Sequence, residues 1–230
     1  MKSFLKSTLV ASAVALSASA FAAGPVTVDI DQSTFQSLTT DSVLPSAGSW
    51  VEFTLNGIAG GDLAIELDAS VASIGSFAAY CTDLSKALVT PGKYTFSDTQ
   101  VDSIGRLFAV AGFNGNDWAH DGVSGFQTSA LQVAIWEVSH DSLATANLDS
   151  GNLVFTAINS NVKSQAQAYL TAAAALSAGQ YSPDVRAFTS VGGIEGLSQP
   201  LVTAVPEPST YAMIAACLGA VGLVSRRKSA

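Results

Sequence analysis

The stretch SWVEFTLNGIAGGDLAIELDAS, residues 49–70, contains two runs in which apolar and polar side chains alternate, SWVEFTLNG and DLAIELDAS. This period of two is typical of strands that bury one face of a sheet. VTVDID upstream has the same period, and SFAAYCTD and GKYTFS downstream continue the series. The first half of the chain therefore predicts a sheet.

Helical patterns occupy the middle of the chain. Ser97 or Asp98 is expected to cap a helix over TQVDSIGRLFAVAG that ends at Gly112. The elements expected after it are, in chain order, the loop NGNDWAHDGVSG, a helix over about 128–139, a helix over about 160–176, and short strands beyond Gly179. Strands with a segregated group of helices favour an α+β fold. We expect a β-sheet-rich sandwich or barrel with a small inserted helical cluster over residues 23–190, followed by a linker over 191–205.

The first 22 residues have the three parts of a secretory signal peptide. Lys2 and Lys6 supply positive charge, LVASAVALSASAFA is a short apolar core, and AFA at its end is an A-x-A cleavage site. The core is too short and too rich in Ala and Ser to predict a membrane span. We therefore expect cleavage after Ala22 and a mature chain that begins near Ala23.

The tail, residues 206–230, also has three parts. They are the stiff cluster Pro206, Glu207 and Pro208, fourteen mostly apolar residues over 211–224, and the basic pair Arg226 and Arg227. The apolar run is shorter than the roughly 20 residues of a stable helical span, and the basic residues behind it would stay in the cytoplasm. An ordinary tail anchor is the alternative, although an anchor has no need of a Pro-x-Pro cluster.

This tripartite tail resembles the PEP-CTERM sorting signal. The resemblance implies a Gram-negative envelope, transient insertion of the tail into the inner membrane, and cleavage at the Pro-Glu-Pro cluster by an exosortase-type processing enzyme. It also implies delivery to the cell surface or to an exopolysaccharide matrix.

Removal of both ends changes the composition of the chain. Five basic residues remain against seventeen acidic ones, which gives a net charge of −12. Nucleic acids and anionic membranes bind clustered Lys and Arg, so neither is expected as a partner. Cys217 lies in the tail, which leaves Cys81 alone. An unpaired cysteine in an exported protein suggests intermolecular pairing or a reactive group.

The predicted helix over 128–139 contains a polar residue, Gln132, at the edge of its apolar side. At roughly 100° per residue, one stripe gathers the apolar residues Phe126, Ala130, Leu131, Ala134, Ile135 and Val138. Gln132 falls just outside this stripe, with Trp136 one turn later beside it. A buried Gln is normally satisfied by a neighbouring backbone group, which is the simplest interpretation of Gln132.

Taken together, YCTD around Cys81 and LQVAIWE around Gln132 resemble the internal thioester domains of bacterial surface adhesins. In that family an aromatic–Cys pair and a helical hydrophobic–Gln–x–hydrophobic–hydrophobic–Trp motif supply the two halves of a Cys–Gln cross-link. The family often has Thr before the Gln, where this chain has Leu131. The resemblance implies a thioester between Cys81 and Gln132 that attaches the protein to an amine or a hydroxyl of a surface or matrix partner, polysaccharide or protein.

Residues that assist such chemistry are harder to identify from sequence. Asp83 shares a side with Cys81 on a strand and is a possible assistant, although it also suits the turn DLSK. His140 and His120 are possible assistants or plain surface histidines. Glu137 lies more than a third of a helical turn from Gln132 and is discounted as a base. Tyr80 and Trp136 are expected to shield the bond or to pack in the core.

Three classes of function remain open. The first is covalent binding through a thioester, with a single turnover rather than enzymatic catalysis. The second is a non-catalytic matrix or adhesion module in which Cys81 is a buried small hydrophobe, and the third is a cysteine hydrolase that uses Cys81 with His120 or His140. The hydrolase lacks a family-type cysteine signature and a clear loop for an oxyanion. The two separated histidines do not have metal-ligand spacing, and no Gly-rich phosphate loop is present, so no metal or cofactor is expected.

Overall fold

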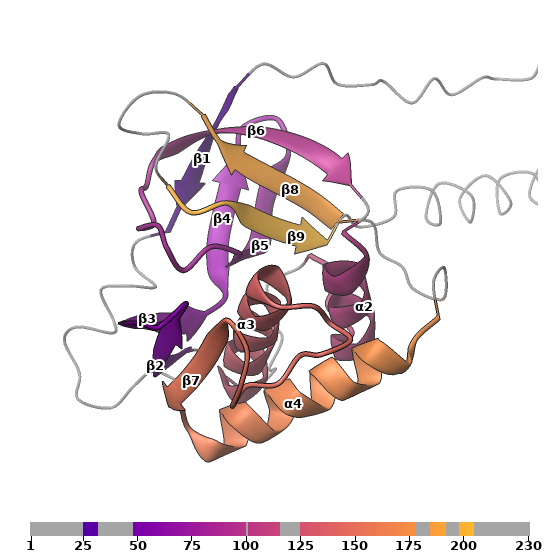
Figure 1. Ribbon diagram of the computed structural model, residues 1–230. Coiled ribbons are helices and arrows are strands. Elements are labelled where there is room, and N and C mark those ends of the chain that lie inside the picture. The colour runs from indigo at the N-terminus through magenta and orange to yellow at the C-terminus, as the bar shows by residue number, and fades with distance from the viewer. Residues whose placement is uncertain are drawn as a thin grey trace, which may run out of the picture.

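Six strands close into a barrel at one end of the molecule, and three helices lie with a second sheet at the other end (Figure 1). This computed structural model describes residues 25–31, 48–99, 101–115, 125–177, 185–191 and 198–204. Around the barrel the strands are β1 (Val26–Ile30), β4 (Leu67–Val71), β5 (Gly75–Cys81), β9 (Leu201–Ala204), β8 (Val185–Ser190) and β6 (Gly92–Thr99). Each neighbouring pair is antiparallel, and β1 closes the barrel by pairing with both β4 and β6.

The second sheet has three antiparallel strands and packs beside the helices. Its order is β3 (Ile58–Ile65), β2 (Gly48–Leu55) and β7 (Leu153–Ala157). The helices of the described residues are α2 (Asp102–Ala111), α3 (Gly125–His140) and α4 (Ser160–Ala175). The predicted α+β class, with a barrel and a small helical cluster, is confirmed.

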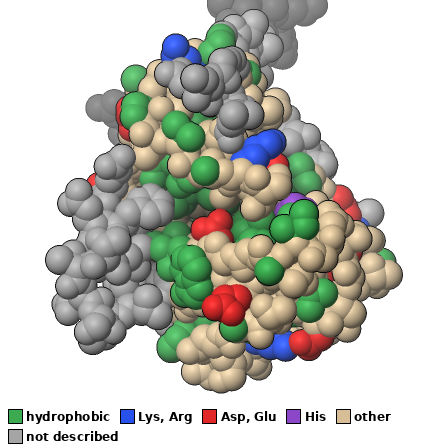
Figure 2. Space-filling model, turned by 60° about the vertical axis from the view of Figure 1, so that its left-hand side comes forward, with side chains coloured by type: hydrophobic (Ala, Val, Ile, Leu, Met, Phe, Trp, Pro, Cys, Tyr) green, Lys and Arg blue, Asp and Glu red, His purple; other side chains and the backbone are tan. Residues whose placement is uncertain are grey.

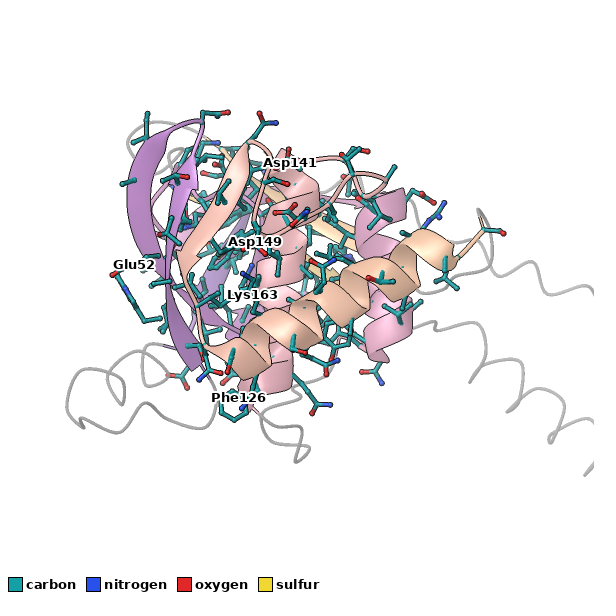
Figure 3. The ribbon with its side chains drawn as sticks, turned by 60° about the horizontal axis from the view of Figure 1, so that its bottom comes forward. Glu52, Phe126, Asp141, Asp149 and Lys163 are labelled. Atoms are coloured by element: carbon teal, nitrogen blue, oxygen red, sulfur yellow. The ribbon has the colours of Figure 1, made fainter. Side chains whose placement is uncertain are left out.

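The helix α3 lies at the centre of the helical end. It packs against α2, α4 and strands β2, β3 and β5. Every residue from Thr128 to Glu137 is buried, so this helix has no solvent-facing side over that stretch. The prediction that Phe126 belongs to a buried stripe is wrong: its side chain is 45% exposed and lies at the start of the helix, at the edge of the molecule (Figure 3).

The run DLAIELDAS forms two strands rather than one. The break falls at Glu66, where the chain leaves the three-stranded sheet at the end of β3 and enters the barrel as β4. Glu66 is only 4% exposed, and its Oε2 accepts a 2.6 Å hydrogen bond from the hydroxyl of Tyr80. A buried carboxylate at the crossing point needs this partner, so the contact ties the crossing to β5.

The first helix starts later than the sequence predicts. Ser97 and Asp98 do not cap it, because both lie in β6 opposite Ala187 and Arg186 of β8. The helix α2 instead begins after Val101, which makes no side-chain cap. Its predicted end at Gly112 is confirmed, with a φ of 74° that glycine adopts without strain.

Two further strands differ from expectation. The short strand β7 has no counterpart in the sequence-based prediction. The segment expected to be a linker, 191–205, includes β9, which pairs with β5 and β8 and so belongs to the barrel. The loop expected over NGNDWAHDGVSG lies mostly outside the described residues. Within the described part of the chain, no helix has the length and apolar character needed to cross a bilayer.

Candidate functional site

Cys81 is the last residue of β5, where it pairs with Leu201 of β9. Its side chain is 7% exposed and forms no disulfide. Successive residues of a strand point to opposite faces, so Tyr80 and Cys81 face different surroundings. The barrel wall therefore carries this cysteine at its rim, next to the helices.

Gln132 reaches Cys81 from the middle of α3. Its Oε1 accepts a 2.9 Å hydrogen bond from the backbone N–H of Cys81, and its Nε2 donates a 2.7 Å hydrogen bond to the backbone carbonyl of Cys81. Gln132 is 1% exposed. Two hydrogen bonds to one residue fix the plane of the carboxamide, so the amide group is held against the residue that bears the thiol.

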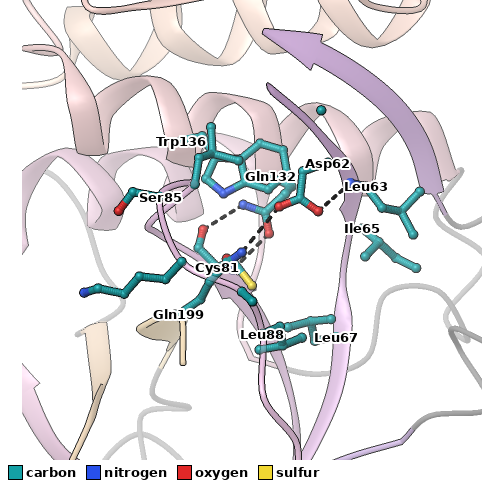
Figure 4. Close-up of a pocket in the computed structure, with 14 residues that line it drawn as sticks. Asp62, Leu63, Ile65, Leu67, Cys81, Ser85, Leu88, Gln132, Trp136 and Gln199 are labelled. Carbon is teal, nitrogen blue, oxygen red and sulfur yellow. Dashed lines mark hydrogen bonds between the residues drawn. The ribbon is translucent and has the colours of Figure 1, made fainter. Parts of the chain in front are cut away.

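These two residues share the wall of a cleft of about 420 Å³, here called the Cys81 cleft (Figure 4). Strand β3 contributes Gly61, Asp62 and Leu63, the loop after β5 contributes residues 84–88, and α3 contributes Trp136. Gln199, just before β9, completes the wall. The cleft is thus built where the barrel, the second sheet and the central helix meet.

The Cys81 thiol holds its proton tightly. Burial raises its pKa far above the ordinary value for cysteine, and the negative charge of Asp62 adds to the effect. The thiol is therefore neutral at physiological pH, and any reaction at sulfur requires that the proton be removed inside the cleft.

Asp62 was not identified from sequence. Its Oδ1 accepts a 2.8 Å hydrogen bond from the backbone N–H of Leu63, and its Oδ2 accepts a 3.3 Å hydrogen bond from Nε2 of Gln199. The alternation of β3 gave no signal, because Leu63 and Ile65 form the apolar side of the strand and Asp62 falls on the other side. In the structure both sides are buried at the end of β3, where Ala64 and Ile65 are 0% and 3% exposed.

Two polar atoms of the cleft wall are buried without a hydrogen-bond partner among the described residues. They are the indole Nε1 of Trp136 and the Oε1 of Gln199. Buried polar groups are normally paired. These two groups are therefore polar atoms of the wall that no described residue satisfies.

Comparison with known proteins identifies the tail of the chain. Residues 204–228 match the family described as the PEP-CTERM protein-sorting motif. The chain carries a PEP-CTERM sorting signal. The resemblance of the tail to this signal is confirmed, and the chain is exported toward the cell surface. The residues Pro206, Glu207, Pro208, Arg226 and Arg227 all fall inside the matched segment and outside the described residues.

No curated protein matches the chain. Two solved structures from Streptococcus pyogenes are similar to it. The N-terminal domain of the pilus tip adhesin Cpa is 15% identical, with a TM-score of 0.39, over 71% of this chain and 96% of that one. The N-terminal thioester domain of the fibronectin-binding protein SfbI is 16% identical, with a TM-score of 0.41, over the same shares of the two chains.

The two predicted assistants lie away from the Cys81 cleft. Asp83 and His140 line a second cavity of about 500 Å³, between the barrel strands β8 and β9 and the helices α2 and α3. Asp83 accepts a 2.9 Å hydrogen bond from the backbone N–H of Ser85 and pairs with Lys86 at 3.0 Å. Burial opposes its ionisation, but the hydrogen bonds from Ser85 and Lys86 outweigh burial and lower its pKa. These contacts are those of a turn-stabilising residue.

The electrostatics of His140 favour its neutral form. Burial lowers its pKa, although the carboxylates of Asp83 and Asp141 act in the opposite direction. His120 lies outside the described residues.

The two predicted shielding residues occupy different environments. Tyr80 is fully buried, donates to Glu66 and packs edge-on against Phe113, with ring centroids 5.2 Å apart. It does not line the Cys81 cleft. Trp136 does line it, and its indole lies beside the Gln132 carboxamide (Figure 4).

Glu137 follows Trp136 in α3 but contacts the loop after α3 rather than the Cys81 cleft. It is fully buried, and its Oε1 accepts a 2.7 Å hydrogen bond from the backbone N–H of Asn147. Burial raises its pKa to about 7, despite that hydrogen bond, with a smaller contribution from Asp141. Glu137 thus holds the loop after α3 and does not line the cleft.

Charged groups elsewhere on the surface are sparse. On the face shown in Figure 2, Lys and Arg side chains of the described residues do not gather into a patch, and some lie beside Asp or Glu side chains. Within the described ranges, His, Cys, Asp and Glu side chains form no group that could hold a metal ion.

Proposed function

We propose that the exported protein attaches covalently to a surface or matrix partner through an internal thioester between Cys81 and Gln132. The observation that carries this proposal is the pair of hydrogen bonds between the Gln132 carboxamide and the Cys81 backbone. They hold the Gln132 carboxamide against the residue that bears the thiol, in a buried cleft, and such positioning removes a large part of the barrier to a reaction between two groups. The sequence motifs around both residues support the same reaction.

The formation step balances without any added reagent. The sulfur of Cys81 attacks Cδ of Gln132, the C–N bond breaks, and the nitrogen leaves as ammonia with the thiol proton. Negative charge collects on Oε1 during the attack, where the backbone N–H of Cys81 already donates. A fixed donor at this oxygen stabilises the transition state.

The transfer step also needs only the partner. An amine or hydroxyl attacks the thioester carbon, the C–S bond breaks, and the proton of the nucleophile ends on sulfur. The product is an amide or an ester between Gln132 and the partner, with a free Cys81 thiol. Each molecule reacts once, so the protein is a covalent binder rather than an enzyme.

The location of the protein fits this activity. We propose that the signal peptide, residues 1–22, is removed on export from a Gram-negative cell and that an exosortase-type enzyme cleaves the tail at the Pro-Glu-Pro cluster after its transient insertion in the inner membrane. The mature domain then reaches the cell surface or an exopolysaccharide matrix. Sugar hydroxyls and protein amines are both present there.

Intact mass spectrometry of freshly purified protein tests the proposal. We expect a mass lower than the sequence mass by one ammonia, and a Cys81 that resists alkylation under native conditions. Methylamine should restore mass at Gln132 and expose one thiol, because an amine is a better nucleophile than water toward an acyl group. Cys81→Ala and Gln132→Ala should each abolish the deficit. A full mass with a freely alkylated Cys81, in protein never exposed to amines, would refute the thioester.

A non-catalytic matrix module is the second candidate, because one observation also favours it. The same two hydrogen bonds satisfy a buried amide, which is a purely structural role for Gln132. The full-mass outcome above would select this function. The hydrolase receives less support, since no histidine among the described residues lines the Cys81 cleft.

A further inference from the structure

This inference rests on the proposed thioester. Because the Cys81 thiol is neutral, the reaction needs a group that moves protons. The thiol must lose its proton as sulfur attacks, and the departing nitrogen must gain one to leave as ammonia. In the transfer step, the nucleophile must lose a proton and sulfur must gain one. A group that accepts and returns a proton beside sulfur would serve both steps.

The described wall of the Cys81 cleft contains one carboxylate, Asp62. Its only other charged side chain is Lys86, which pairs with Asp83 at 3.0 Å and as an ammonium has no lone pair to accept a proton. Glu137 contacts the loop after α3, and Asp83 and His140 line the second cavity. Among the described residues, Asp62 is therefore the one placed to act as a base in this cleft.

Two hydrogen bonds hold the Asp62 carboxylate in position and leave it able to accept a proton. The backbone N–H of Leu63 donates to Oδ1 and the amide of Gln199 donates to Oδ2. A carboxylate has about four lone-pair directions, so each oxygen retains one for a further proton. Asp62 also lies close enough to Cys81 for its charge to act on the thiol.

We propose that Asp62 carries the proton in both steps of the reaction. During formation it takes the proton from the Cys81 sulfur as the S–C bond forms and gives it to the Gln132 nitrogen as the C–N bond breaks. During transfer it takes a proton from the incoming amine or hydroxyl and gives it to sulfur as the C–S bond breaks. Asp62 is unchanged at the end of each step.

Gln199 is the positioning residue for this carboxylate. Its backbone N–H donates a 3.0 Å hydrogen bond to the carbonyl of Ala87, which fixes its own place in the wall. Its Nε2 holds Asp62, and its Oε1 is buried without a partner in the described structure. Gln199 therefore links the Asp62 carboxylate to the backbone of the loop after β5.

The test compares the wild-type protein with Asp62→Asn, which keeps the shape of the side chain and removes the base. Two quantities are measured: the fraction of fresh protein that lacks one ammonia, and the rate at which methylamine exposes the Cys81 thiol. We expect Asp62→Asn to form less thioester and to open about 100-fold more slowly, a typical loss for one acid–base group. Asp149→Asn, the same change at an exposed ion pair with Lys163 (Figure 3), is the matched control and should match wild type.

Two rescue measurements separate proton transfer from a structural role. Asp62→Glu should recover part of the opening rate, and added formate should accelerate opening in Asp62→Asn but not in wild type. Gln199→Ala should slow opening less than Asp62→Asn, because it displaces the base without removing it. A slow Asp62→Asn variant that neither formate nor Asp62→Glu restores would show a structural role and overturn the proposal.

The outcomes also separate this inference from the proposed function. A wild-type protein with the ammonia deficit and an Asp62→Asn variant with wild-type formation and opening would overturn the role of Asp62 alone. A wild-type protein of full mass with a free thiol would overturn both.

Discussion

The buried carboxylate of Glu137 should make the protein less stable as the pH rises. The carboxyl has an ordinary pKa of 4.5 when the chain is unfolded and a pKa of about 7 in the fold, mainly because of burial. The folded state thus holds this proton more tightly. The resulting stabilisation is complete below pH 4.5 and is lost as the pH rises through 7. At about 1.4 kcal/mol per pKa unit, the loss is about 3 kcal/mol of unfolding free energy.

Glu137→Gln isolates this contribution. Glutamine keeps an oxygen for the N–H of Asn147 and is neutral at every pH, so the decline should disappear in the variant. Urea denaturation curves would be measured for both proteins below pH 4.5, between pH 4.5 and 7, and above pH 7. The two proteins should agree at the lowest pH, and the variant should be more stable by about 3 kcal/mol at the highest.

The comparison contains its own controls. His140 also titrates in this range, and the lowering of its pKa makes stability rise with pH, but it is present in both proteins and cancels in the difference. Glu52→Gln makes the same substitution at an exposed position (Figure 3) and should parallel wild type. If the curves for wild type and Glu137→Gln run parallel across the whole range, the buried ionisation described here is refuted.

Two further outcomes are expected. Tyr80→Phe removes the hydrogen bond to Glu66 and should lower the free energy of unfolding by about 1–3 kcal/mol in urea denaturation. Methylamine should open the thioester of this variant at the wild-type rate, because Tyr80 does not line the Cys81 cleft. A changed opening rate at unchanged stability would show that Tyr80 shields the bond after all. Terminal sequencing of protein from its native host should find a start near Ala23 and no tail from about Pro206, and recovery of chains that still carry Arg227 would contradict processing of both ends.

Local patterns predicted most elements of the fold because each strand or helix has its own period. The break at Glu66 escaped this reasoning, since alternation continues unchanged from β3 into β4 while the chain passes from one sheet to another. The strand β7, LVFTA, begins with three apolar residues in a row and so shows no alternation. Phe126 was misplaced because it lies in the first turn of α3, before the buried stretch that starts at Thr128.

The site was predictable only where its residues form part of a motif. Cys81 and Gln132 stand in recognisable contexts, and the structure brings them into contact across 51 residues of chain. Asp62 and Gln199 have no such context, because their meeting depends on the second sheet and on closure of the barrel by β9. Asp83 was chosen by extending the strand two residues too far: β5 ends at Cys81, so the expected shared side does not exist.

The place of β9 in the barrel has a consequence for the order of assembly during export. Strand β5, which ends at Cys81, gains its second neighbour only when residues 201–204 arrive, and Gln199 enters the cleft wall just before them. During export, a chain whose last residues have not yet emerged therefore has its thiol and its amide outside before the wall around them is complete. If the proposed thioester forms, its formation would be delayed until nearly the whole domain has emerged, away from the nucleophiles of the compartment in which the chain is made.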